Sequence, residues 1–232
     1  MDVRGLGTAV NVSTVLTGTT VGVLARRALP RHVKEAIPKA LGVFTIALGI
    51  RQAMQTSNVL IMLGGLLSGV VVGSCLRLDD RLESLVSRSK DQMTLSRSRL
   101  HDAVVLPSLV FCVGPMTLLG AIQDGANAHP ELLIVKAAMD GFASMAFAAA
   151  LGAGVYLSAA VILVFQGGLT LAAGLVAPLL SERLVSEMTA AGGLIVISIG
   201  MKLSKVEDLP VADYLPALIT TPLIVAVVTA VS

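Results

Sequence analysis

Two charged residues inside an apolar stretch offer the first indication of chemistry in this chain. Lys136, Asp140 and Ser144 fall at positions i, i+4 and i+8, so they form one polar stripe if the stretch is helical. Counted from Leu132 at about 1.5 Å per residue, Lys136 lies roughly 6 Å and Asp140 roughly 12 Å into a hydrocarbon core about 30 Å thick. The long lysine side chain can extend back to the interface, whereas the aspartate cannot.

An ionised carboxylate at the depth of Asp140 costs about 2.5–3.5 kcal/mol on insertion scales. Asp140 must therefore pair, face a watery cavity or hold a proton. Two hypotheses stay open: Asp140 is a carboxylate that couples transport to a proton or cation, or it forms a structural ion pair with Lys136. The order of the two residues does not decide between these hypotheses, because an ion pair in which the lysine stands four residues before the acid is the weaker of the two helical arrangements.

A helix-breaking pair in the apolar segment 103–122 is the second candidate. Gly114 and Pro115 stand near its middle, where proline removes a backbone donor and predicts a kink. Carbonyl groups freed at such breaks bind ions or polar groups in transporters, and a simple packing kink is the alternative. Cys112 and Met116 flank the break, but no histidine lies nearby, so we predict no copper-type site.

The composition explains why these residues stand in apolar surroundings. The chain has 232 residues, of which 55% are hydrophobic and 14% charged, whereas soluble domains carry about 25% charged residues. This excludes a soluble enzyme, a nucleic-acid-binding protein and a disordered chain. It predicts a polytopic membrane protein that has the lipid bilayer as its partner, with homo-oligomer formation left open.

Cysteines and histidines give no sign of a cofactor or of enzymatic chemistry. Cys75 and Cys112 both lie in apolar runs, which indicates neither a disulfide framework nor a zinc site. His32, His101 and His129 are scattered over three connections, so they predict no catalytic triad or metal cluster. We therefore expect no metal, no cofactor and no enzyme activity.

The apolar segments predict an all-α membrane fold of about eight transmembrane helices, since one crossing needs about 20 residues. They are 6–24, 40–54, 58–76, 103–122, 132–151, 154–176, 190–204 and 211–231. The second and seventh are short enough to be re-entrant, so the range is six to eight. The first segment ends at Arg26 and Arg27 rather than at a small-residue cleavage site, which predicts a retained helix.

Charge predicts the orientation of these spans. Of the 17 Lys and Arg residues, 13 lie in the connections after the first, third, fifth and seventh spans, and three lie on the opposite side. The positive-inside rule then places both termini outside a bacterial inner membrane. The basic connection 77–101 carries six of these cations. It is either a solvated face against lipid headgroups or a segment that docks a cytoplasmic partner.

An internal similarity predicts an inverted repeat. Residues 29–37 followed by Gly42 and Gly49 align with residues 180–188 followed by Gly193 and Gly200, at a constant offset of 151. Five spans separate the two beginnings, so the copies would cross the membrane in opposite senses, as in many secondary transporters. A chance resemblance of two amphipathic linkers is the alternative.

Under this repeat, Asn11 in the first span and Gln166 with Thr170 in the sixth are nearly equivalent. They either line one pocket or form interhelical hydrogen bonds, each worth about 0.6 kcal/mol. The expected domain divides into a first repeat (1–76), the basic connection (77–101), a central kinked helix pair (102–153) and a second repeat (154–232). The ten candidate residues for binding a solute or ion are Asn11, Cys112, Gly114, Pro115, Met116, Lys136, Asp140, Ser144, Gln166 and Thr170.

An ordered set of short motifs along the whole chain resembles a known family. They are Gly7-Thr8, Asn11, Phe111 to Met116, Gln123-Asp124-Gly125, Lys136, Asp140-Gly141, Ser144, Gly152, Gly154, Ser158, Gln166-Gly167, Gly192-Gly193 and Leu215-Pro216-Ala217. The chain is similar to the bacterial membrane proteins called domain of unknown function 554, the YqgA/YdfK-like family. The resemblance implies an inner-membrane protein of a family often labelled as transport proteins, with no substrate implied. The chain departs from the family at Asp102-Ala103-Val104, before Pro107, where an acidic-Gly-Phe sequence is usual.

We therefore expect a secondary transporter of a small ion or polar metabolite, with Asp140 as the coupling carboxylate. The alternative is a membrane scaffold or sensor that docks a cytoplasmic partner through residues 77–101.

Overall fold

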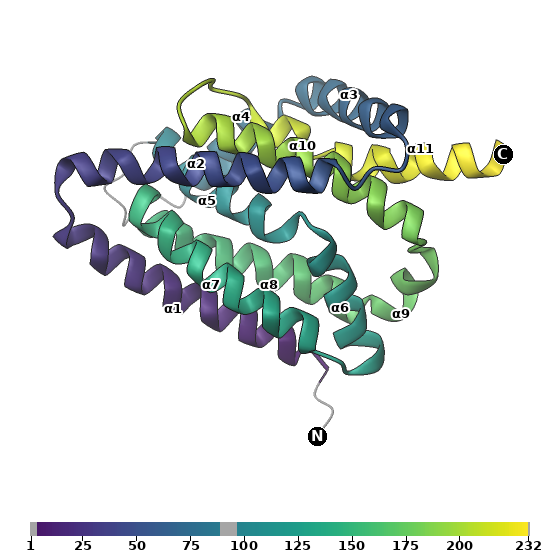
Figure 1. Ribbon diagram of the computed structural model, residues 1–232, viewed down its shortest axis with the longest axis horizontal. Coiled ribbons are helices and arrows are strands. Elements are labelled where there is room, and N and C mark those ends of the chain that lie inside the picture. The colour runs from purple at the N-terminus through teal and green to yellow at the C-terminus, as the bar shows by residue number, and fades with distance from the viewer. Residues whose placement is uncertain (1–3, 89–96, 232) are drawn as a thin grey trace. The chain divides into compact units, whose positions relative to one another are not determined.

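The computed structural model describes residues 4–88 and 97–231 of the chain, and all regular structure in these ranges is helical. In chain order the helices are α1 (Leu6–Ala28), α2 (Arg31–Ala53), α3 (Val59–Leu76), α4 (Leu78–Arg88), α5 (Arg97–Cys112), α6 (Pro115–Asn127), α7 (Glu131–Leu151), η2 (Ala153–Val155), α8 (Tyr156–Leu171), α9 (Ala173–Val176), η3 (Ala177–Leu179), α10 (Glu182–Leu203), η4 (Val211–Tyr214) and α11 (Ala217–Val231). Figure 1 shows them as a ribbon.

The length and apolar character of these helices confirm a helical membrane protein. Within the described ranges, six helical segments are long and apolar enough to cross a bilayer; they contain α1, α3, α7, α8, α10 and α11. A seventh is formed by α5 and α6 if that pair is one span, because the two are bent by 65° across a short break. The predicted number of eight stays a prediction, since α2 is not among the segments that pass this test.

Two helices are longer than the spans predicted for them. We expected spans at 40–54 and 190–204 preceded by amphipathic linkers, but α2 already begins at Arg31 and α10 at Glu182. The Ser181 hydroxyl caps α10 by accepting a hydrogen bond from the Leu184 amide at 3.2 Å, which sets the earlier start. With 22 residues, α10 has the length to cross the membrane without re-entering.

The basic connection falls partly outside the structure. Its first part forms α4, and α5 begins at Arg97, whereas residues 89–96 lie outside the described residues. The prediction that residues 77–101 dock a partner therefore stays a prediction.

Contacts divide the chain into two compact units, each built from two stretches of sequence. Unit 1 comprises Met1–Pro38 with Ser98–Leu180, and unit 2 comprises Lys39–Arg97 with Ser181–Ser232. This division by contacts leaves the predicted division into repeats and a central pair as a prediction.

In unit 1, α1 lies between two helices of opposite direction. It runs parallel to α7, because Gly7 lies against Leu133 and Gly22 against Met145. It runs antiparallel to α8, because Thr8 contacts Thr170 while Thr20 contacts Tyr156. Figure 1 shows α1, α7 and α8 side by side, and this group of helices holds most of the candidate residues.

In unit 2, glycine residues bring the backbones of α2 and α10 together. A Cβ atom added at Gly42 would meet the Gly200 carbonyl oxygen at 2.6 Å, and one at Gly49 would meet that of Gly193, also at 2.6 Å. Since 42 pairs with 200 and 49 with 193, the two helices are antiparallel. The α3 and α11 helices are also antiparallel, with Gly69 against Ala217.

Candidate functional site

The polar stripe of α7 is buried in unit 1. The exposed fraction is 6% for Lys136, 8% for Asp140 and 0% for Ser144. The Lys136 ammonium donates to Oδ2 of Asp140, so the two charges are paired. The Ser144 hydroxyl instead donates to the carbonyl oxygen of Gly141 on its own helix at 2.8 Å, which leaves it out of the ion pair.

Asn11 links this pair to α8. Its Nδ2 donates to Oδ2 of Asp140 at 3.0 Å and to Oε1 of Gln166 at 2.9 Å. Asn11 and Gln166 are both fully buried. The two amides predicted to be near-equivalent therefore meet directly, beside the predicted carboxylate.

The hydrogen bonds continue from Gln166 to two threonines. Gln166 Nε2 donates to the Thr8 hydroxyl at 3.1 Å, and the hydroxyls of Thr8 and Thr170 lie 3.2 Å apart. Six side chains of three helices are thus connected in one series, which we call the polar chain. Its members are Lys136, Asp140, Asn11, Gln166, Thr8 and Thr170.

One atom of the polar chain is not satisfied. Oδ1 of Asn11 is buried and has no hydrogen-bond partner among the described residues. Buried polar atoms without a partner are rare in folded proteins, and they cost stability. A carbonyl oxygen without a partner beside a carboxylate is an acceptor that a solute, a water molecule or an ion can use.

A cavity reaches the far end of the polar chain. It has a volume of about 580 Å³ and is lined by both Thr8 and Thr170. Arg4 and Gly5 at the start of α1 line it as well, as does Gly167 of α8. The cavity therefore borders the two threonines, from which hydrogen bonds lead to Asp140.

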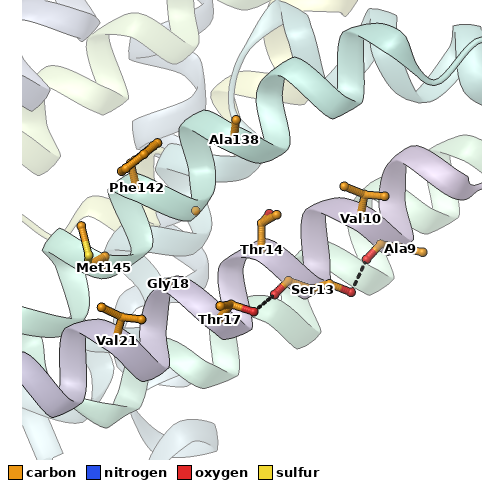
Figure 2. Close-up of a pocket in the computed structure, with 11 residues that line it drawn as sticks. Ala9, Val10, Ser13, Thr14, Thr17, Gly18, Val21, Ala138, Phe142 and Met145 are labelled. Atoms are coloured by element: carbon orange, nitrogen blue, oxygen red, sulfur yellow. Dashed lines mark hydrogen bonds between the residues drawn. The ribbon is translucent and has the colours of Figure 1, made fainter.

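A second hollow lies between α1 and α7 (Figure 2). This groove of about 560 Å³ is lined largely by apolar groups, with Phe142 and Met145 on the α7 side. The hydroxyls of Ser13 and Thr17 donate to carbonyl oxygens of their own helix at 2.8 Å, as the dashed lines show. No member of the polar chain lines this groove, so we do not take it as part of the candidate site.

The predicted break in the fourth span is present, and two of its carbonyls accept hydrogen bonds from Thr117. The bend separates α5 from α6, and Pro115 is the first residue of α6. The Phe111 carbonyl accepts a hydrogen bond from the Thr117 hydroxyl at 3.0 Å, and the Gly114 carbonyl accepts from the Thr117 amide at 3.1 Å. These bonds fit a packing kink better than an ion-binding break.

The other residues of the break take no part in the polar chain. Cys112 is buried, close enough for the charges of Lys136 and Asp140 to act on its thiol. Met116 is half-buried in the first turn of α6. None of Cys112, Gly114, Pro115 and Met116 lines the cavity or the groove. In the part of the chain that the structure describes, no cluster of three or more His, Cys, Asp or Glu residues could hold a metal ion.

Sequence reasoning missed two residues that fix the ends of the helices around the polar chain. Asp124 is fully buried and accepts hydrogen bonds from the amides of Gly5 at 3.2 Å and Gly7 at 3.1 Å. It therefore caps the first turn of α1, where free amides favour an anion. The Arg26 guanidinium donates to the carbonyl oxygens of Ala149 and Ala150 at the end of α7.

Asp124 and Arg26 each bind a helix end that lies more than 100 residues away in the sequence. Asp124 was visible in the sequence as part of a Gln-Asp-Gly motif, but nothing local indicates that it pairs with Gly5 and Gly7.

The family signature covers nearly the whole of this fold. Residues 6–226 match the model of the family described as Protein of unknown function (DUF554). The chain belongs to this family. The resemblance predicted from the ordered motifs is thereby confirmed.

Two relatives extend over the same length. The chain is 27% identical over 219 residues to "Uncharacterized protein YqgA" of Escherichia coli (strain K12), which covers 92% of this chain and 93% of that protein. It is 24% identical over 226 residues to "Uncharacterized membrane protein YdfK" of Bacillus subtilis (strain 168), which covers 96% of each chain. No solved structure matches the chain significantly.

Proposed function

We propose that this protein is a secondary transporter of a small ion or polar solute in the bacterial inner membrane. The observation that carries the proposal is the polar chain, which runs from the buried Lys136–Asp140 pair to a cavity lined by Thr8 and Thr170. In this proposal the cavity admits the solute and Asp140 is the coupling carboxylate. Both termini face outward, as the distribution of Lys and Arg predicts.

The cost of the buried pair supports a functional role. Charged groups within membrane-spanning helices are expensive, and they mark ion or substrate pathways in many membrane proteins. Asn11, whose amide nitrogen contacts Asp140, also keeps a buried amide oxygen that has no partner among the described residues. An unsatisfied acceptor at this place is more consistent with a site that changes its occupant.

The helix bounds support the inverted repeat on which many secondary transporters depend. Adding the offset of 151 to the bounds of α2, 31–53, gives 182–204, and α10 spans Glu182–Leu203. Adding it to the bounds of α3, 59–76, gives 210–227, where η4 and α11 follow each other.

The directions of paired helices also support the inverted repeat. In each unit, helices that correspond under the repeat lie antiparallel to each other: α1 with α8 in unit 1, and α2 with α10 and α3 with α11 in unit 2. This is the relation expected when a two-fold axis in the membrane plane relates two oppositely threaded copies.

Charge movement in proteoliposomes tests the proposal. Purified protein on a solid-supported membrane is exposed to concentration jumps of lithium, sodium and potassium chloride, glycine, proline and succinate. We expect at least one solute to evoke a current that wild-type protein shows and the Asp140→Asn variant lacks. Asp80→Asn, the same change at an exposed position of α4, is the matched control and should keep the current.

Two results would contradict the proposal. One is an Asp140→Asn current equal to that of wild type, with both proteins eluting as a single species from a sizing column. The other is the absence, for every solute, of any current above that of protein-free liposomes.

A further inference from the structure

We infer that the solute is a small monovalent metal cation, bound by oxygen atoms at Asp140 in exchange for the Lys136 ammonium. The inference rests on the proposed function and names the substrate class of the same site. In this view Lys136 is a tethered cation that occupies the site when no metal ion is bound.

Asp140 and the side chains linked to it by hydrogen bonds carry oxygen atoms of the kinds that hard cations prefer. Asp140 contributes a carboxylate, Gln166 contributes Oε1, and Asn11 contributes the amide oxygen that has no partner. Thr8 and Thr170 add two hydroxyl oxygens along the way to the cavity. Carboxylate, amide carbonyl and hydroxyl oxygens suit alkali and alkaline-earth ions, whereas soft metals prefer sulfur or imidazole.

Charge balance selects a monovalent cation over the alternatives. The Lys136–Asp140 pair is neutral as a whole and buried in a low-dielectric region, where net charge is costly. When a metal ion of charge +1 replaces the ammonium at Asp140, the site stays neutral. A divalent ion would leave a net positive charge there, and an anion added to the intact pair would leave a net negative one.

In this inference the Lys136 side chain withdraws from Asp140 toward the start of α7. It lies five residues after Glu131, the exposed first residue of α7, so the ammonium can withdraw toward that end along its flexible stem. The start of α7, toward which Lys136 would withdraw, lies next to the start of α1, because Gly7 is packed against Leu133. The exposed Arg4 at the rim of the cavity is hydrated, so its field is screened before it reaches Asp140.

Binding of salts to the detergent-solubilised protein tests this inference. Isothermal titration calorimetry measures the affinity for lithium, sodium and potassium chloride, with choline chloride holding the ionic strength constant. We expect Lys136→Met to bind at least one of these cations about tenfold more tightly or better, because the site is no longer occupied by the ammonium for most of the time. Lys136→Arg keeps a permanent charge beside Asp140 and should bind no more tightly than wild type.

Two further variants separate this effect from damage to the fold. The double variant Lys136→Met/Asp140→Asn leaves no unpaired buried charge, and it should fold but bind no cation. Lys202→Met removes the lysine of another Lys–Asp pair, Lys202–Asp208 in unit 2, and should leave the affinity unchanged.

The inference is overturned if Lys136→Met binds all three cations no more tightly than wild type, or if the double variant still binds them. It is also overturned if glycine or succinate binds in an Asp140-dependent manner while the cations do not. Binding in detergent does not require transport. An Asp140-dependent current without cation binding would therefore remove this inference alone, and cation binding without a current would remove the proposed transport alone.

Discussion

Asp140 and Glu187 are both buried carboxylates, yet their surroundings differ. Glu187, on α10 in unit 2, is fully buried and accepts four hydrogen bonds from the turn before α3. The donors are the Thr56 hydroxyl, the Ser57 hydroxyl and amide, and the Asn58 amide, at 2.7–2.9 Å. Every donor is part of one short turn, so Glu187 fixes that turn, whereas Asp140 is paired with the Lys136 side chain and accepts a hydrogen bond from Asn11 of α1.

At the residue scale, we expect Glu187→Gln to be destabilising. The amide keeps one acceptor oxygen, but its NH₂ group faces a donor that the carboxylate had satisfied. The loss is about 2–3 kcal/mol, typical of hydrogen bonds to a charged group. Thermal unfolding followed by circular dichroism in detergent should show a Tm lower by several degrees. The exposed Glu207→Gln is the control, and an unchanged Tm for Glu187→Gln would refute this role.

The helical period predicted some residues of the site and could not predict others. Lys136 and Asp140 share a helix, so their spacing alone placed them together. Asn11 and Gln166 are 155 residues apart, and the proposed repeat predicted that they either line one pocket or form an interhelical hydrogen bond. The structure shows the hydrogen bond, and neither residue lines the cavity or the groove. Glu187 was hidden because its partners are hydroxyls and backbone amides of a turn about 130 residues away, and a sequence pattern gives no sign of such long-range hydrogen bonds.

At the scale of elements, the crossing of α2 and α10 depends on the absence of side chains. A Cβ atom at Gly200 would lie 2.6 Å from the Gly42 carbonyl oxygen, and one at Gly49 would lie 2.6 Å from that of Gly193. Gly200 and Gly49 are 151 residues apart, so they are equivalent under the proposed repeat. The two positions should therefore respond alike to the same substitution.

We expect Gly200→Ala and Gly49→Ala each to lower stability by about 1–3 kcal/mol, because the backbones must separate to admit the methyl group. Gly64→Ala in α3 is the matched control. Its Cβ would meet Ile224 at an ordinary 3.4 Å, and alanine favours a helix by up to about 1 kcal/mol. Thermal unfolding of the three variants, followed by circular dichroism, should give a lower Tm for Gly200→Ala and Gly49→Ala than for Gly64→Ala. Equal Tm values for all three would contradict the close crossing.

The lengths of two helices differ from the spans predicted for them. Charged residues between 31 and 39 looked like a linker by hydropathy, although the backbone stays helical from Arg31. The Arg31–Glu35 pair, one turn apart with both side chains exposed, shows that this part of α2 is a solvated helix. Hydropathy measures the preference for lipid, so it cannot tell where a helix ends once the helix enters water.

At the scale of the whole molecule, the predicted orientation can be tested with a matched pair of histidines. His32 lies in the first turn of α2, on the stretch that we predicted as the connection after the first span, and His129 lies in the connection after the fourth. Both are exposed. In a Cys75→Ser background, we expect His129→Cys to react with a membrane-impermeant maleimide on intact cells. His32→Cys should react only after lysis. Reaction of His32→Cys on intact cells, with His129→Cys protected, would reverse the orientation.

The proposed function depends most on solvent access: water or ions must reach the polar chain beside Asp140 from the cavity. An experimental density map that resolves ordered solvent measures this directly. We predict density for a water molecule or an ion beside Oδ1 of Asn11, and solvent in the cavity that Thr8 and Thr170 line. A map in which apolar side chains fill that cavity, with nothing between Asn11 and its protein neighbours, would contradict the account.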